Sequence, residues 1–298
     1  MGHDHNNAPA NYNKAFAIGV ALNLGYIVVE VIAGLTVHSL ALLADAGHNT
    51  SDVFSLLLAW GASYLCQTTP TKRHTYGFRG SSILASLANA IILLIAIGAI
   101  AWESIRRFGE PINVPGNTIM FVAAIGVLIN GATALLFVKG RERDLNIKGA
   151  FLHMAADAGV SAGVILAGLA ITLTGAQWVD PAVSLLIVVV IAIGTWGLLR
   201  DSLNLSLGAV PREIDPTAVE NYLLALPGVT KVHDLHIWAM STTETALTAH
   251  LVKPDAEIDD ARLGCICDEL HQRFGIGHAT IQLEKGETLC RQESHQTV

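Results

Sequence analysis

Charged residues are scarce in this chain. They make up 14% of its 298 residues, whereas a typical soluble domain carries roughly 25%. Because hydrophobic residues reach 52%, this deficit excludes intrinsic disorder and argues against a wholly soluble protein. Cysteine is scarce too: the four cysteines have no C-x-x-C spacing, which excludes a disulfide framework and a zinc finger. The net charge of −7 argues against nucleic acid as a partner.

The charge that is present lies mostly at one end. Residues 1–200 hold 11 Lys and Arg against 10 Asp and Glu, whereas residues 201–298 hold 7 against 15. The last third of the chain therefore carries over half of the charged residues. This division predicts a membrane domain followed by a small, acidic domain in water.

Six runs in the first 200 residues are long enough to cross a bilayer, which takes about 20 mostly apolar residues of helix. The third, fourth and sixth contain no Lys, Arg, Asp or Glu. The predicted spans are about Ala15–Leu35, about Leu40–Leu65, Gly80–Trp102, a span within Pro111–Val138, about Gly149–Leu173 and Pro181–Leu199.

Basic residues in the short loops predict the orientation, because Lys and Arg concentrate on the cytoplasmic side. The loops after the second and fourth spans are basic, whereas the opposite loops offer only Arg106 and Arg107. We therefore expect both termini in the cytoplasm, and the polar first residues do not resemble a cleavable signal peptide. The expected organisation is a cytoplasmic tail at 1–13, a six-helix transmembrane domain at 14–207, a cytoplasmic α+β domain at 208–290 and a C-terminal tail at 291–298.

The sequence of the acidic domain predicts two helices and three strands in the order αββαβ, which is typical of a two-layer α+β fold. The first helix has Asp215 as its expected N-cap and Pro216 at its first helical position. The predicted elements are helices at Ile214–Leu226 and Asp260–Phe274 and strands at Val232–Met240, Thr245–Val252 and Ala279–Leu283.

Two of the predicted spans carry the same pair of ionisable residues. His48 and Asp52 stand four residues apart on the second span, and His153 and Asp157 do so on the fifth. Residues at i and i+4 share one helix face, and ionisable residues in membrane helices usually face a bundle interior. Two nitrogens and two oxygens suit tetrahedral zinc, whereas the lack of sulfur disfavours copper(I). A structural hydrogen-bonding role is the alternative for each residue.

The charges of these four residues predict an exchange of metal for protons. With both carboxylates ionised and both imidazoles neutral, an empty site carries two negative charges, which are costly at membrane depth. We expect the empty site to hold protons, most readily on His48 and His153. A divalent metal neutralises the carboxylates but needs neutral histidines, so its binding displaces protons. Exposed alternately to the two sides, such a site makes an antiporter.

Other polar and small residues lie near this site in the sequence. Asp45 has three open roles: an acceptor for a ligand histidine, a charge on the access path, or an accessory ligand. Asn23 and Glu30 on the first span could line the same cavity, with interhelical hydrogen bonding as the favoured role. Gly159 and Gly163 form a G-x-x-x-G pair that predicts close packing against another helix.

These motifs resemble those of the cation diffusion facilitator family. Ser39-Leu-Ala-Leu-Leu-Ala-Asp-Ala-Gly-His-Asn-Thr-Ser-Asp52 resembles its second-span signature, and His153-Met-Ala-Ala-Asp157 its fifth-span counterpart. Trp178–Leu185 and His233–Trp238 are also similar to family segments. The resemblance implies a homodimeric metal/proton antiporter whose cytoplasmic domain is metallochaperone-like and serves regulation and dimerisation. It implies His48, Asp52, His153 and Asp157 as transport ligands, and zinc, with cadmium, as the ion.

The resemblance also places His233, His250 and Glu284 where some members of the family bind regulatory zinc. Leu263 and Gln282 stand where those members have two further histidines, so a two-metal cluster is not expected. The alternative is that these histidines bind no metal.

Three further features bear on metal binding outside the membrane. A regular strand would turn His233 and His236 to opposite faces, so at most one should join His250. The candidate soft ligands are Cys265, Cys267 and Cys290, and a short metal-attracting cluster at the N-terminus consists of His3, Asp4 and His5.

Two other classes of function compete with a carrier. A membrane metal sensor needs an output domain, and the acidic tail has no catalytic or DNA-binding signature. An intramembrane metalloenzyme keeps an open position on its zinc, and the H-E-x-x-H motif is absent. We therefore predict a non-enzymatic exporter in the inner (plasma) membrane, without a catalytic cofactor. It carries Zn²⁺, with Cd²⁺ as a second ion and Co²⁺, Fe²⁺ or Mn²⁺ as the alternatives.

Overall fold

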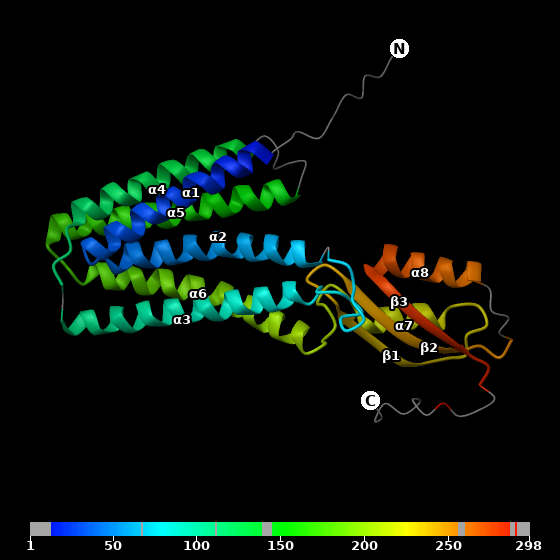
Figure 1. Cartoon of the computed structure of the whole chain (residues 1–298). Coiled ribbons are helices and arrows are strands. Elements are labelled where there is room, and N and C mark those ends of the chain that lie inside the picture. Colours follow the sequence, from blue (N-terminus) through cyan, green and yellow to red (C-terminus); the bar gives the residue numbers. More distant parts are fainter. Residues whose placement is uncertain are drawn as a thin grey trace, which may run out of the picture. The chain divides into compact units, whose positions relative to one another are not determined.

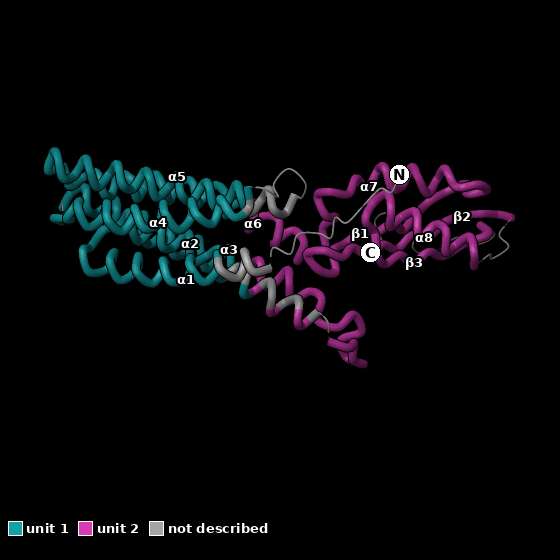
Figure 2. The backbone as a smooth tube through the Cα atoms, turned by 90° about the horizontal axis from the view of Figure 1, so that it is seen from above, with its two compact units in different colours: residues 1–57, 89–196 teal, residues 58–88, 197–298 magenta. Residues whose placement is uncertain are grey.

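The computed structural model describes residues 13–66, 68–110, 112–138, 145–255, 260–286 and Cys290. The chain forms two compact units, coloured separately in Figure 2. Unit 1 comprises Met1–Leu57 and Asn89–Trp196, and unit 2 comprises Leu58–Ala88 and Gly197–Val298. The predicted N-terminal cluster with His3 and His5, and the tail at 291–298, lie outside the described residues.

Six long helices occupy the predicted membrane domain (Figure 1). They are α1 (Asn13–Thr36), α2 (Leu40–Cys66), α3 (Ser81–Gly109), α4 (Gly116–Phe137), α5 (Leu145–Thr174) and α6 (Val179–Ser206). All but α2 are long and apolar enough to cross a membrane by length and composition. Helix α2, at 27 residues, is also long enough, but Asp45, His48 and Asp52 lower its hydropathy. The predicted six-helix bundle is confirmed.

Large apolar side chains on these helices point outward, and several polar ones point inward. Ile95, Leu128 and Leu173 are each at least two-thirds exposed, whereas Glu30 and Asp45 are fully buried. Lipid can surround the apolar exterior, and polar groups inside a bundle can pair with one another. This distribution is the one expected of helices that cross a bilayer.

Asp180 of α6 fixes the start of α2. Its carboxylate accepts hydrogen bonds from the Ser39 hydroxyl at 2.5 Å and from the backbone N–H groups of Leu40 and Ala41 at 2.8 and 3.3 Å. The first N–H groups of a helix have no partner inside it, and the helix dipole favours an anion there. A residue distant in sequence therefore caps α2 and holds it against α6.

Replacing Asp180 with alanine is expected to lower the free energy of unfolding by about 2 kcal/mol, the upper range for loss of a helix cap. Thermal denaturation of the purified full chain in detergent measures the effect. Glu110→Ala, at an exposed position just beyond α3, is the control and should leave the stability unchanged. Equal stability of the two variants would rule out the capping role.

The domain at the C-terminal end has the predicted αββαβ order. Its elements are α7 (Pro216–Leu224), β1 (Lys231–Ala239), β2 (Thr245–Val252), α8 (Asp260–Phe274) and β3 (Ile276–Glu284). Asp215 caps α7 as predicted, because its carboxylate accepts a hydrogen bond from the Thr217 N–H at 2.9 Å. Strand β2 is central, antiparallel to β1 and parallel to β3.

One face of this sheet is covered by both helices. Leu247, Ala249 and Leu251 of β2 belong to a single core with residues of α7 and α8. Because successive side chains of a strand alternate between faces, His250 points to the opposite face.

Strand β1 contains a bulge that the sequence did not predict. Its register against β2 shifts between His233 and His236, and Asp234 between them has a φ of 51°. His233 pairs with His250 and His236 with Thr248, two residues on the same face of β2. The prediction that the two β1 histidines face opposite ways is therefore wrong.

Candidate metal centres

Four side chains from α2 and α5 meet inside unit 1. The Nε2 atom of His48 lies 3.9 Å from Asp52 Oδ2 and 3.4 Å from Asp157 Oδ1. The Nε2 atom of His153 lies 3.2 Å from Asp52 Oδ2 and 3.6 Å from Asp157 Oδ2. Each imidazole thus contacts the carboxylate of its own helix, four residues on, and that of the other helix.

These separations fit a tetrahedral ion. Bonds of about 2.0–2.1 Å from zinc to nitrogen or oxygen place neighbouring ligand atoms about 3.3 Å apart. The measured nitrogen–oxygen distances of 3.2–3.9 Å bracket that value. His48, Asp52 and Asp157 also offer ligand atoms within 4.8 Å of one another. The two imidazole centroids are 6.1 Å apart, so closing the cage requires the two rings to approach each other.

The burial of one oxygen atom of each carboxylate favours a cation over a purely structural role. The Asp157 side chain is 2% exposed, and that of Asp52 is 32% exposed. Apart from their histidine contacts, Asp52 Oδ2 and Asp157 Oδ1 are buried and have no hydrogen-bond partner among the described residues. Because a buried charged oxygen without a donor is costly, a bound cation or protonated histidines must compensate it.

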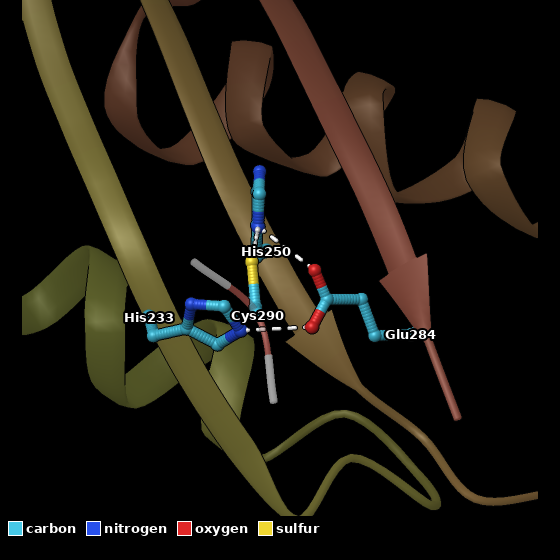
Figure 3. A group of neighbouring side chains, drawn as sticks. All are labelled: His233, His250, Glu284 and Cys290. Atoms are coloured by element: carbon cyan, nitrogen blue, oxygen red, sulfur yellow. Dashed lines mark hydrogen bonds and ion pairs between the residues drawn. The ribbon is translucent and has the colours of Figure 1, made fainter. Parts of the chain in front are cut away.

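A second group of ligand-type side chains lies on the face of the three-stranded sheet opposite the core that β2 shares with α7 and α8 (Figure 3). His233 Nε2 is 3.0 Å from Glu284 Oε2, and His250 Nδ1 is 2.9 Å from Glu284 Oε1. Cys290 brings its Sγ within 3.7 Å of His250 Nδ1. These four residues offer ligand atoms that all lie within 4.8 Å of one another. The structure thus brings together the three residues that the sequence suggested with Cys290, one of the three candidate soft ligands.

Glu284 has the charge that a metal ligand needs. Burial alone would raise the pKa of its carboxyl, but hydrogen bonds with His233, Cys290 and Gln282 outweigh burial and lower this pKa below its usual range. Glu284 is therefore ionised at neutral pH.

His236 reaches this cluster only through Asp234, which the sequence did not single out. Asp234 Oδ1 is 3.0 Å from His236 Nε2, and its Oδ2 is 3.5 Å from His250 Nε2. The bulge in β1 turns the Asp234 carboxylate between the two rings, where it can orient His250.

Comparison with known proteins decides the family. The model of the cation efflux transmembrane domain matches residues 16–205, and that of the cation efflux protein cytoplasmic domain matches residues 211–286. The chain belongs to the cation efflux, or cation diffusion facilitator, family. The predicted membership is confirmed, and the family is one of transporters.

Several curated members of the cation efflux family span almost the whole chain. The metal cation efflux system protein CzcD of Cupriavidus metallidurans is 35% identical over 95% of this chain and 90% of its own length. Zinc transporter ZitB of Escherichia coli is 36% identical over 95% and 93%. The cadmium, cobalt and zinc/H⁺-K⁺ antiporter of Bacillus subtilis is 34% identical over 95% and 92%.

A solved structure of part of a relative matches part of this cation efflux protein. The metal-bound C-terminal domain of the CzcD transporter from C. metallidurans is 40% identical. It covers 24% of this chain and 99% of its own, with a TM-score of 0.22.

The other polar residues predicted near the His48–Asp52–His153–Asp157 cluster join helices. Asp45 accepts a hydrogen bond from Ser161 of α5 at 3.1 Å, which links α2 to α5 beside the site. Asn23 donates to the Gly19 carbonyl at 3.0 Å and lies 3.6 Å from the sulfur of Met154, next to His153. Neither residue has a hydrogen bond or ion pair with a ligand side chain among the described contacts.

Glu30 of α1 forms a buried hydrogen-bond network with α2. It accepts hydrogen bonds from Tyr26 at 2.8 Å and from Asn49 of α2 at 3.2 Å. Asn49 directly follows His48 in the chain. This network therefore holds α1 against the segment of α2 that carries the histidine, in keeping with the favoured interhelical role of Glu30.

Proposed function

We propose that this cation efflux protein exports Zn²⁺, with Cd²⁺ as a second substrate, in exchange for protons. The observation that supports this proposal is the convergence of His48, Asp52, His153 and Asp157 at separations that suit a tetrahedral ion. Two carboxylates balance the charge of one divalent cation, and two neutral imidazoles supply the nitrogen ligands that zinc accepts. The set has no sulfur, which leaves copper(I) an unsuitable cargo.

The exchange follows from charge balance at the four ligands. When the metal leaves, two carboxylates remain at membrane depth, and protons on His48 and His153 compensate them. When metal returns, both imidazoles must give up those protons. The site therefore holds either one metal ion or protons, and alternating access moves them in opposite directions.

Membrane orientation is part of the same proposal. Basic loops after α2 and α4 support a cytoplasmic location for both termini and for the domain at 208–290. We place the protein in the inner (plasma) membrane as a homodimer, a state supported by its similarity to the cytoplasmic domain of this family. In this orientation zinc leaves the cytoplasm while protons enter.

The cytoplasmic residues His233, His250 and Glu284 form, in this proposal, a regulatory zinc site separate from the transport site. They offer two nitrogens and an ionised carboxylate within ligand distance of one another. Such a site would report cytoplasmic zinc to the carrier without lying on the transport path.

Growth rescue tests the choice of ion. Cells that lack their own exporters are grown on Zn²⁺, Cd²⁺, Co²⁺, Fe²⁺ and Mn²⁺, with and without this protein. The proposal expects rescue from zinc and cadmium. Rescue from manganese or iron without rescue from zinc would overturn the assignment of the ion and leave the export function intact.

A further inference from the structure

Cys290, the fourth cysteine of the chain, lies beside His233, His250 and Glu284. A metal ion bound by those three residues would need a fourth ligand at this position. His233, His250 and Glu284 come from β1, β2 and β3, and Cys290 follows β3 by six residues (Figure 3). Two of these side chains are well buried, since His233 is 3% exposed and His250 7%. Four ligand-type atoms gathered at a buried position are not explained by packing alone.

We propose that Cys290 is a metal ligand, and that His233, His250, Glu284 and Cys290 together bind one thiophilic divalent cation such as Zn²⁺ or Cd²⁺. The proposal rests on the regulatory assignment of the first three residues above. It is independent of the transport site, which uses different residues in unit 1.

The distances in the cluster fit four-coordination with one sulfur. Zinc bonds of about 2.3 Å to sulfur and about 2.0–2.1 Å to nitrogen place those two ligand atoms about 3.6 Å apart in a tetrahedron. The separation between Cys290 Sγ and His250 Nδ1 is 3.7 Å. The nitrogen–oxygen separations of 2.9 and 3.0 Å are shorter than about 3.3 Å, so metal binding would spread the Glu284 contacts slightly.

The donor set determines which ions fit. A thiolate with two imidazoles and one carboxylate is a soft-to-borderline set, which disfavours Mg²⁺ and Mn²⁺ and favours Zn²⁺ and Cd²⁺. Four protein ligands also close the coordination sphere, as in structural zinc sites. A bound ion would therefore tie Cys290 to all three strands.

Cobalt(II) absorption tests this assignment on the full-length protein. All variants carry Asp157→Ala, which disables the proposed transport site and confines the measurement to the cytoplasmic cluster. The parent protein should show thiolate-to-cobalt charge-transfer absorption, which Zn²⁺ removes by competition. Cys290→Ser should abolish this absorption and weaken cobalt binding by at least about tenfold, because loss of a group that merely orients a metal ligand already costs about that much.

Two matched variants separate ligation from structural damage. Cys265→Ser removes an exposed cysteine of α8 and should leave the absorption unchanged. Cys290→His keeps a ligand atom, so it should lose the charge-transfer band yet bind cobalt within about tenfold of the parent. A band that survives Cys290→Ser, disappears in Cys265→Ser, or is absent from the parent would overturn the proposal. All of these proteins carry Asp157→Ala, so the measurement does not involve the proposed transport site. A negative result would count against Cys290 as a ligand and not against the antiport proposal.

Discussion

Asp157→Ala is expected to abolish zinc transport, lowering the initial rate by at least about 100-fold, because loss of a group that merely orients a metal ligand already costs up to about that much. Asp157 is the most buried of the four proposed transport ligands, with a side chain 2% exposed, and its two oxygens contact both histidines. Its loss removes one ligand and one of the two negative charges that balance the ion. Zinc uptake into inside-out membrane vesicles measures the effect.

Asp201→Ala is the matched control for this variant. Asp201 lies on α6 and pairs with Arg212 at 2.8 Å. It belongs to unit 2, whereas the four ligands belong to unit 1. Its replacement should leave transport within about twofold, since a partly exposed ion pair contributes little. Transport by Asp157→Ala at the level of this control, with equal amounts of both proteins in the membrane, would refute the transport site.

His48→Asp is expected to change which ion is carried. The substitution converts a set of two nitrogens and two oxygens into one nitrogen and three oxygens, and it adds a negative charge. Oxygen-rich sets suit harder ions such as Mn²⁺, whereas imidazole suits zinc. We expect the ratio of zinc to manganese transport to fall by about tenfold or more, measured by competing the two ions in the same vesicles.

The control for this variant is His38→Asp. His38 is exposed between α1 and α2 and has a φ of 57°, a conformation that aspartate tolerates. It should keep the wild-type selectivity. If His48→Asp carries zinc and manganese in the wild-type ratio, the imidazole of His48 does not select the ion.

The sequence predicted those features that depend on local spacing. Apolar runs located six helices, and the repeated His–Asp spacing of four predicted that each pair would share a face of its helix. Helix ends were predicted less well: α3 continues through Arg106 and Arg107 to Gly109, beyond the predicted end at Trp102. Hydropathy marks the apolar stretch, whereas backbone hydrogen bonds continue into the polar ends.

Features that depend on tertiary contact could not be predicted. Asp180 caps a helix about 140 positions earlier in the chain, and Cys290 meets His250 across 40 positions. The bulge at Asp234 reverses the expected face of His236, because a single positive φ shifts the alternation of the strand.

The helices pack closely at glycines other than the pair that the sequence suggested. A Cβ atom at Gly159 or Gly163 would meet nothing within 4 Å, so the packing expected for this pair does not occur within the described chain. At Gly116 and Gly168 it would clash at 2.3 and 2.7 Å across the contact between α4 and α5. Spacing alone does not say which helix face meets a neighbour.

The most direct test of a site that holds either metal or protons is to follow both ions together. Inside-out vesicles that carry the protein and enclose a pH indicator receive Zn²⁺ at the face that corresponds to the cytoplasm. We predict that zinc accumulates in the lumen while the lumen becomes more alkaline, and that Asp157→Ala eliminates both changes. Zinc accumulation in wild-type vesicles without any change in lumenal pH would contradict the exchange.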